Sequence, residues 1–285
     1  MVILIAGSGS ARSDAQTTRP SADEMVRSVD SLASRVVTSG PSSALGVAMA
    51  MDGRTVLSRA YGWADATNHI RADSHTLWYI ASTSKSLTGF GVSLLAQQGI
   101  LDLAAPISAL LPGVKWPDGV DPSKLTLATF LSHMHHLNED VFVQNAAFTG
   151  VVPEARWAEL IPFTSPTGSR DLVYGNFGYN IAAMVIDRKR PEGWRRFLDS
   201  AVYAPTGMHQ TYACVSCVDQ RRIAKPHRPT QSGGFMTLKF EKTDATMNSA
   251  GGHLATLHDL ARWVIVQMDS GGSTRARYFP PRPLV

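Results

Sequence analysis

Residues 78–88 carry the strongest structural signal in this sequence. They read Trp-Tyr-Ile-Ala-Ser-Thr-Ser-Lys-Ser-Leu-Thr, an apolar run that leads into a predicted helix. A helix places residues three apart on one face, so we expect the hydroxyl of Ser82 and the amine of Lys85 to lie within hydrogen-bond reach. A serine becomes a good nucleophile when a base takes its proton, and a lysine removed from water can be that base. The pair is therefore a candidate for nucleophilic catalysis.

The pattern Ser-x-x-Lys also fits a serine that caps a helix beside a lysine on the surface. Among the lysines of the chain, only Lys85 has a serine three residues before it. Residues 86–96 are apolar almost all round the predicted helix, which is typical of a buried helix. A lysine at the start of a buried helix is expected to be buried itself, and this favours the catalytic interpretation.

The first 20 residues allow two interpretations. Residues 2–6 are apolar and precede a small polar run, like the end of a secretory signal peptide without its basic start, so we expect residues 1–20 to be disordered or a signal remnant. Alternatively, residues 2–6 form a strand before a dinucleotide-binding loop, but Arg12 stands where that loop requires a third glycine. The run is too short to span a membrane. We expect an exported, periplasmic location, and a cytoplasmic one stays open.

The rest of the chain predicts an α+β fold. Residues 23–39 have the period of an amphipathic helix, and residues 45–51 and 54–61 are predicted strands joined by Asp52-Gly53, a strong hairpin signal. The region after residue 82 is largely helical, with Gly99 as the cap of the first helix. The later predicted helices are residues 126–133, 177–190, 192–202 and 257–268.

Composition excludes some functions. The 285 residues include 27 Lys and Arg against 23 Asp and Glu, and no basic stripe interleaved with aromatic residues occurs, so we expect no nucleic-acid partner. Cys214 and Cys217 form a lone C-x-x-C pair, and a zinc site would need a second pair. A tight disulfide and two inert thiols both stay open for this pair.

Six stretches, in order, resemble the β-lactamase-related serine hydrolase superfamily, which includes class C β-lactamases, penicillin-binding D-alanyl-D-alanine carboxypeptidases and family VIII carboxylesterases. The resemblance covers residues 24–272 and implies a β-lactamase/penicillin-binding-protein-like fold, an antiparallel sheet with a large helical region. It divides the domain at residues 21–272 into a sheet part, 21–81 plus 254–272, and a helical part, 82–253. The matching stretches are residues 79–88, residues 99–112, Leu131-Ser132-His133, residues 174–179, residues 205–208, and residues 249–253 with residues 259–261.

The resemblance implies a role for each site residue. Ser82 would be the nucleophile, Lys85 and Tyr174 would share the proton transfers, and either of these two could be the base. Asn176 would hydrogen-bond Lys85 or the carbonyl of the substrate, and Asn176, Gly252 and His253 are the candidate substrate-binding residues. The expected function is hydrolysis of a short-chain ester, amide or β-lactam through an acyl-enzyme, with a small-molecule substrate and without a cofactor or metal. The alternative is a non-catalytic binding module of the same fold.

The sequence departs from the family in two places. Met134-His135-His136 stand where the family has Thr-Ser-Gly, and these histidines invite a metal interpretation, which we do not adopt. The family's third motif, Lys-Thr-Gly or His-x-Gly on a strand of the cleft wall, does not occur after Gly252. We therefore hypothesise missing C-terminal strands, an atypical tail at residues 273–285, impaired activity, and a hairpin at residues 45–61 with an unpaired edge and an uncovered face. The oligomeric state is not predicted.

Overall fold

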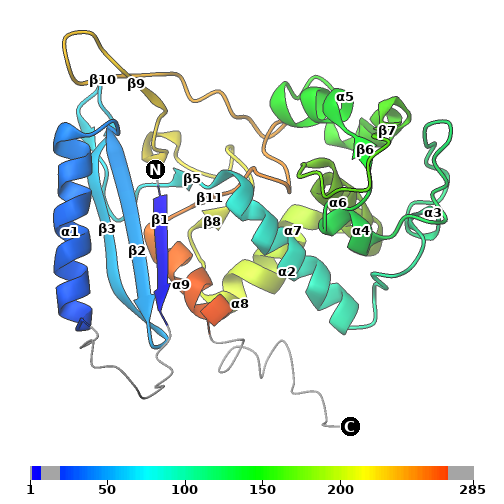
Figure 1. Cartoon of the computed structure of the whole chain (residues 1–285), viewed down its shortest axis with the longest axis horizontal. Helices are drawn as coiled ribbons and strands as arrows, with labels where there is room; N and C mark the ends of the chain where they lie inside the picture. Colours follow the sequence, from blue (N-terminus) through cyan, green and yellow to red (C-terminus); the bar gives the residue numbers. More distant parts are fainter. Residues whose placement is uncertain (1, 8–19, 269–285) are drawn as a thin grey trace.

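The structure, a computed structural model, describes residues 2–7 and 20–268. Figure 1 shows a sheet with a helix on each face on one side of the molecule and a mainly helical region on the other. This is the predicted α+β arrangement, a β-lactamase/penicillin-binding-protein-like fold with helices and small, mostly antiparallel sheets. The predicted tail at residues 273–285 lies outside the described residues, so its expectation stays untested.

The larger sheet has the strand order β1-β2-β3-β4. Its strands β2 (Ala44–Met51) and β3 (Arg54–Asp65) form the predicted antiparallel hairpin. The turn residues Asp52 and Gly53 have φ angles of +49° and +74°, as a type I′ turn requires. The short strand β4 (Ile70–Arg71) extends the sheet beyond β3.

Helices cover both faces of β2 and β3. Leu45, Val47 and Met49 pack toward α1 (Ala22–Ser39), which begins at a capping box between Ser21 and Glu24. The alternate residues of β2 face α9 (Leu257–Met268), and a Cβ at Gly46 would lie 2.7 Å from a methyl group of Leu257. The uncovered face predicted from the sequence is therefore wrong: α1 and α9 enclose the sheet from opposite sides (Figure 1).

The predicted unpaired edge is also corrected. Residues Val2–Gly7 form β1, which pairs in parallel with residues 46–51 of β2. These six residues form a strand, as the alternative interpretation expected for residues 2–6, and the signal-remnant expectation stays a prediction. Backbone groups of β1 satisfy the ladder of β2 that the sequence left open. Residues 8–19, the remainder of that predicted segment, lie outside the described residues.

A second, three-stranded sheet connects the sheet region to the helical region. Its order is β5 (Trp78–Tyr79), β11 (Leu254–Ala255) and β8 (Thr211–Tyr212), with β11 pairing antiparallel to both neighbours. This pairing places the chain just after Gly252 beside the chain that leads to Ser82. Two segments about 170 positions apart are thus fixed against each other by backbone hydrogen bonds.

The helical region is built around α2 (Ser84–Gln97) and α6 (Phe177–Lys189), which contact each other and enclose the main core. Gly99 has a φ angle of +70° just after α2, as the predicted cap requires. The predicted helix at residues 192–202 is observed as α7 (Trp194–Leu198) continued by a π-helical turn. The other helices are α3 (Ile107–Leu110), α4 (Leu127–Leu131), α5 (Asp140–Val143) and α8 (Ala204–Thr206).

Short turns and strands complete the described chain. The 3₁₀ turns are η1 (Ala81–Thr83), η3 (Glu154–Phe163) and η5 (Gln220–Arg222), and the π turns are η2 (Gln144–Phe148) and η4 (Asp199–Tyr203). The paired short strands are β6 (Leu137–Asn138) with β7 (Ser165–Pro166) and β9 (His227–Pro229) with β10 (Phe235–Thr237). No helix of the described chain has the length and apolar character needed to cross a membrane.

Candidate active site

Ser82 lies in the 3₁₀ turn η1, between β5 and α2, and its side chain is exposed. The preceding Ala81 has a φ angle of +46°, an unfavourable conformation for a residue with a Cβ. Ser84 stabilises this turn, because its hydroxyl donates to the carbonyl of Ala81 (2.6 Å) and accepts from the amide of His253 (3.1 Å). A strained turn held in this way presents the Ser82 hydroxyl to solvent at the start of α2.

Lys85 is buried with 6% exposure, as the apolar surroundings of α2 predicted. Its Nζ donates to the hydroxyl of Ser82 at 3.0 Å, which is the contact expected from their spacing. It also donates to Oδ1 of Asn176 at 2.7 Å and to the carbonyl of Ala250 at 2.8 Å. The three acceptors match in number the three N–H groups of a lysine ammonium, so Nζ is held in one place beside the serine.

Tyr174 approaches the same two residues from the loop before α6. The Nζ of Lys85 lies 4.9 Å from the centre of its ring, and the tyrosine is 59% exposed. Burial raises the pKa of Tyr174. Hydrogen bonding with Ser82 and Lys85 and the positive charge of Lys85 lower it by a larger amount, so the pKa falls below its usual value of 10.0. A phenol with a lowered pKa in contact with a serine hydroxyl can exchange a proton with it.

Gly252 and His253 contribute no side-chain contact to the cluster of Ser82, Lys85 and Tyr174. A Cβ at Gly252 would lie 2.2 Å from the amide nitrogen of Asn248, so a side chain there would force the turn apart. His253 is fully buried between the rings of Trp194 and Tyr203, and burial lowers its pKa to about 3. The structure therefore gives these two predicted substrate contacts a role in backbone packing. The main chain of His253 contacts the turn at Ser82: its carbonyl accepts the amide of Ile80, and its amide donates to the hydroxyl of Ser84.

The three histidines of the 133–136 segment have separate environments. His133 accepts the amide of Gly175 at Nδ1 (3.3 Å) and packs against the ring of Tyr174. His135 is buried, and burial lowers its pKa to about 4. His136 has a φ angle of +55° at the position where the family has glycine. Within residues 2–7 and 20–268, no three His, Cys, Asp or Glu side chains are arranged to hold a metal ion.

Cys214 and Cys217 are joined by a disulfide in the structure. Their Cα atoms are 5.5 Å apart, and the bridge closes a turn of the segment that follows β8. Of the two alternatives left open by the sequence, the tight disulfide is the one observed.

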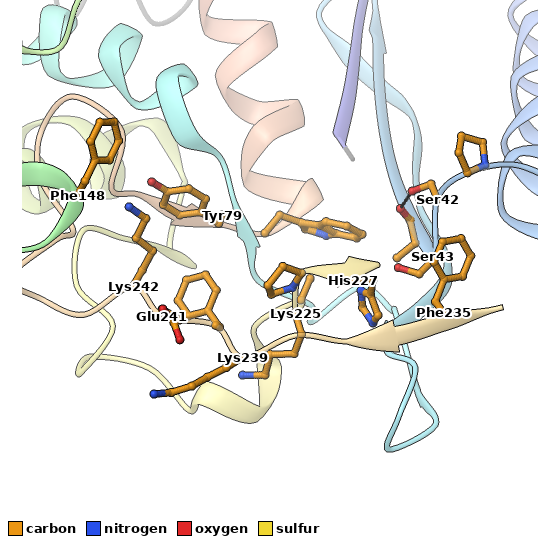
Figure 2. Close-up of a pocket in the computed structure, with 16 residues that line it drawn as sticks. Ser42, Ser43, Tyr79, Phe148, Lys225, His227, Phe235, Lys239, Glu241 and Lys242 are labelled. Atoms are coloured by element: carbon orange, nitrogen blue, oxygen red, sulfur yellow. Dashed lines mark hydrogen bonds between the residues drawn. The ribbon is translucent and has the colours of Figure 1, made fainter. Parts of the chain in front are cut away.

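Two cavities are lined by residues next to the serine cluster, although neither is lined by Ser82 or Lys85 themselves. One of about 570 Å³ is lined by Tyr174, Asn176 and the 139–145 segment, and is open to solvent. The second, of about 610 Å³, lies beside β5 and is lined by Tyr79, Lys242 and other residues of the 224–242 region. Figure 2 shows Tyr79, Phe148 and Lys242 facing one another at one end of the second cavity. Phe148 lines both cavities, so the two spaces adjoin at this ring.

Two contributors to the cluster were missed by the sequence interpretation. The carbonyl of Ala250 accepts from Lys85, although the sequence interpretation used its segment only for the family match and for Gly252 and His253. Glu139 accepts two amides at the start of α6, and no pattern in the sequence links it to that helix. Backbone acceptors and capping contacts between distant segments have no local sequence signature, because they depend on tertiary pairing.

Comparison with known proteins is consistent with this geometry. The model of the family described as Beta-lactamase matches residues 29–279 of the chain. The chain belongs to the beta-lactamase family. Penicillin-binding protein 4* of Bacillus subtilis (strain 168) is 25% identical over 183 residues, which are 58% of this chain and 37% of that protein. The matched part thus spans well under half of that curated relative.

Solved structures show the same fold for this beta-lactamase family member. The D-amino acid amidase from Ochrobactrum anthropi SV3, complexed with L-phenylalanine amide, has a TM-score of 0.71 and 20% identity over 90% of this chain and 73% of that one. EstCE1, a hydrolase with promiscuous acyltransferase activity, has a TM-score of 0.73 and 15% identity over 88% of this chain and 74% of that one. At these identities the similarity establishes the fold, and chemistry has to be argued from the site.

Proposed function

We propose that this chain is a serine hydrolase that cleaves a short-chain ester or an amide-type bond through an acyl-enzyme intermediate. The observation that carries the proposal is the contact of 3.0 Å between Nζ of the buried Lys85 and the hydroxyl of the exposed Ser82. The nucleophile is open to solvent, whereas the cation that supports it is enclosed. This combination lets a substrate reach the serine while the charge of Lys85 acts at short range.

The proposed base is Tyr174. Three oxygen acceptors surround Nζ of Lys85, which favours the ammonium, and the charge of that ammonium helps to lower the pKa of the Tyr174 phenol. In this mechanism the Tyr174 phenolate takes the proton of Ser82 as its Oγ bonds to the substrate carbonyl carbon. Tyr174 then returns that proton to the leaving group when the old bond breaks.

Hydrolysis of the acyl-enzyme would use the same groups in reverse. A water molecule gives its proton to Tyr174 and bonds to the acyl carbon, and Oγ of Ser82 leaves and takes the proton back. Asn176 has the role of holding Lys85 in place through its Oδ1. The 570 Å³ cavity beside Tyr174 and Asn176 is the proposed space for part of the substrate.

Penicillin-binding relatives and amidase and hydrolase neighbours support acyl transfer in general. The choice among ester, amide and β-lactam is our proposal: a short-chain ester is preferred over a β-lactam, and the amide stays open. The second candidate is the non-catalytic binding module of the same fold that the sequence left open. In that case the site would bind an acyl compound without turning it over.

The test is labelling with a fluorescent fluorophosphonate, followed by turnover assays with p-nitrophenyl butyrate, an amino-acid amide and a chromogenic cephalosporin. We expect labelling of the parent chain and its loss in Ser82→Ala. Ser93→Ala is the matched control, because Ser93 lies in the same helix and its hydroxyl donates only to the carbonyl of Gly89. A parent chain that is neither labelled nor active would support the non-catalytic module.

We propose an exported location for the mature protein. The disulfide between Cys214 and Cys217 supports this, because such bridges persist in oxidising compartments. Cell fractionation with thiol alkylation tests it, and a cytoplasmic protein with two free thiols would contradict it.

A further inference from the structure

Glu139 lies directly behind the loop that carries Tyr174 and Asn176. It precedes α5, and its carboxylate is mostly enclosed, with 15% of the side chain exposed. Oε1 accepts the amide of Asn176 at 2.5 Å, and Oε2 accepts the amide of Phe177 at 3.0 Å. The carboxylate thus satisfies two amides at the start of α6, where helical N–H groups have no partners within the helix.

The Glu139 contact belongs to a series along the same loop. The carbonyl of His133 accepts the amide of Val173 at 3.2 Å, and Nδ1 of His133 accepts the amide of Gly175 at 3.3 Å. Together with Glu139, the 133–139 segment therefore provides acceptors for four amides between residues 173 and 177. Asn176 accepts a hydrogen bond from Lys85, and Tyr174 interacts with Ser82 and Lys85. Both residues belong to the 173–177 stretch whose amides are hydrogen-bonded in this way.

Gly175 explains how the carboxylate comes so close. A Cβ at this position would meet the carboxylate oxygens of Glu139 within about 2.5 Å, well inside normal contact distances. Only a glycine lets Glu139 reach the amides on either side of the loop. The glycine and the carboxylate therefore form a matched pair.

We propose that Glu139 is the positioning residue of the catalytic centre, which holds the Tyr174–Asn176 loop against Lys85 through two amide hydrogen bonds. This inference rests on the proposed function for its effect on catalysis. Burial raises the pKa of Glu139 by more than its two amide partners and the charge of Lys85 lower it, so the pKa lies above its usual value, and the nearby Asp140 raises it as well. His135 approaches the same carboxylate, with its Nε2 at 3.8 Å, and Asp140 is the nearest acidic neighbour in sequence.

The first test uses Glu139→Gln, which has the same shape but only one acceptor oxygen. One of the two amides must then face an NH₂ group, so the loop shifts or loosens. We expect the rate constant for fluorophosphonate labelling and kcat to fall by about 10- to 100-fold, because a displacement of about 1 Å at a catalytic group has an effect of this size. We expect KM to change by less than about 3-fold, since the carboxylate contacts backbone and not substrate.

Asp171→Asn is the matched control. It removes one carboxylate charge from the loop that Glu139 supports, and the carboxylate of Asp171 is exposed and accepts from the hydroxyl of Ser169. We expect this variant to keep the parent rate. An equal loss in both variants would overturn the inference, because it would show that charge, and not the two hydrogen bonds, is responsible.

The second test combines Gly175→Ala with Glu139→Ala. Gly175→Ala alone should lower the labelling rate by about 10- to 100-fold, because its methyl group displaces the carboxylate. In the Glu139→Ala background the same change should cost less than about 3-fold, since the obstructing oxygens are gone. Additive losses in the double variant would overturn the inference, because residues that act through one contact are expected to be non-additive.

Amide hydrogen exchange gives a readout that does not require activity. In Glu139→Gln we expect exchange at Asn176 and Phe177 to be at least about 10-fold faster, with thermal unfolding still cooperative. If the parent chain is not labelled by fluorophosphonate, the proposed function fails, and the exchange measurement still decides the positioning role. Unchanged exchange at both amides would overturn that role whether or not the chain is active.

Discussion

The buried imidazole of His253 predicts a measurable acid sensitivity. Burial, with a smaller effect of the Arg195 charge, lowers the pKa of His253 from 6.5 to about 3. The folded protein therefore keeps this ring neutral below pH 6.5, whereas the unfolded chain binds a proton there. Stability from this group is fully present above pH 6.5 and is lost as the pH falls toward 3.

The size of this effect follows from linkage. Each pH unit between the two pKa values changes the free energy of unfolding by about 1.4 kcal/mol, and the slope is half of this at pH 6.5 itself, so His253 should account for about 2 kcal/mol between pH 6.5 and pH 4.5. His135, whose pKa is lowered by burial to about 4, adds a similar dependence in the same range. His253→Gln should remove only the His253 share of the slope.

Urea unfolding at half-unit intervals from pH 7.5 to pH 4.5 measures these slopes. We expect His253→Gln to have a slope smaller by about 1.4 kcal/mol per pH unit below pH 6.5. His209→Gln is the control, because His209 is exposed to solvent in the folded chain as well. If His253→Gln kept the full slope of the parent, the imidazole would be ionising in the folded state and our account of its burial would be refuted. A fluorophosphonate labelling rate within about 3-fold of the parent would separate this packing role from substrate binding.

Four further substitutions test the site and its supports. Lys85→Met should lower fluorophosphonate labelling by about 100-fold or more, because the charge beside Ser82 is lost, and mass spectrometry would measure the residual labelling. In the parent chain we expect the labelling rate to rise as the pH approaches the lowered pKa of Tyr174 from below. Tyr174→Phe should abolish this rise, and a rise that persists in the variant would exclude the phenol as the base. His136→Gly should raise the free energy of unfolding by about 1 kcal/mol in urea titrations, because the φ angle of +55° no longer strains a side chain. Gly178→Ala should prevent a cooperative thermal transition, since its methyl group would lie 2.2 Å from the carbonyl oxygen of Phe130.

Local patterns predicted the local parts of this molecule well. The Asp52-Gly53 turn, the cap at Gly99 and the contact between Ser82 and Lys85 all depend on residues within a few positions of one another. Their geometry follows from the backbone conformations that such residues prefer. Family resemblance extended this to Asn176, whose distance in sequence from Lys85 gives no local clue to their contact at 2.7 Å.

Contacts made by the main chain were harder to predict. His253 was expected at the substrate because its motif lies near the cleft, but there its amide and carbonyl hold the turn while its ring packs away from the site. The side-chain identity of a residue does not reveal which of its groups is used. The same limitation hid Glu139, whose partners are two amides that every sequence would provide at those positions.

The strand β1 shows why the sheet edge could not be predicted. Residues 2–6 form a short apolar run before Gly7, a composition shared by signal segments and by buried strands. Parallel strands need a long crossover, and α1 lies between β1 and β2 in the chain, so the three elements form a β-α-β unit. The hydrogen bonds between strands are made by backbone groups that nearly all residues share, so they do not specify which apolar segment pairs with β2. That pairing also depends on the space between α1 and α9, which is a property of the packed fold and not of a local residue pattern.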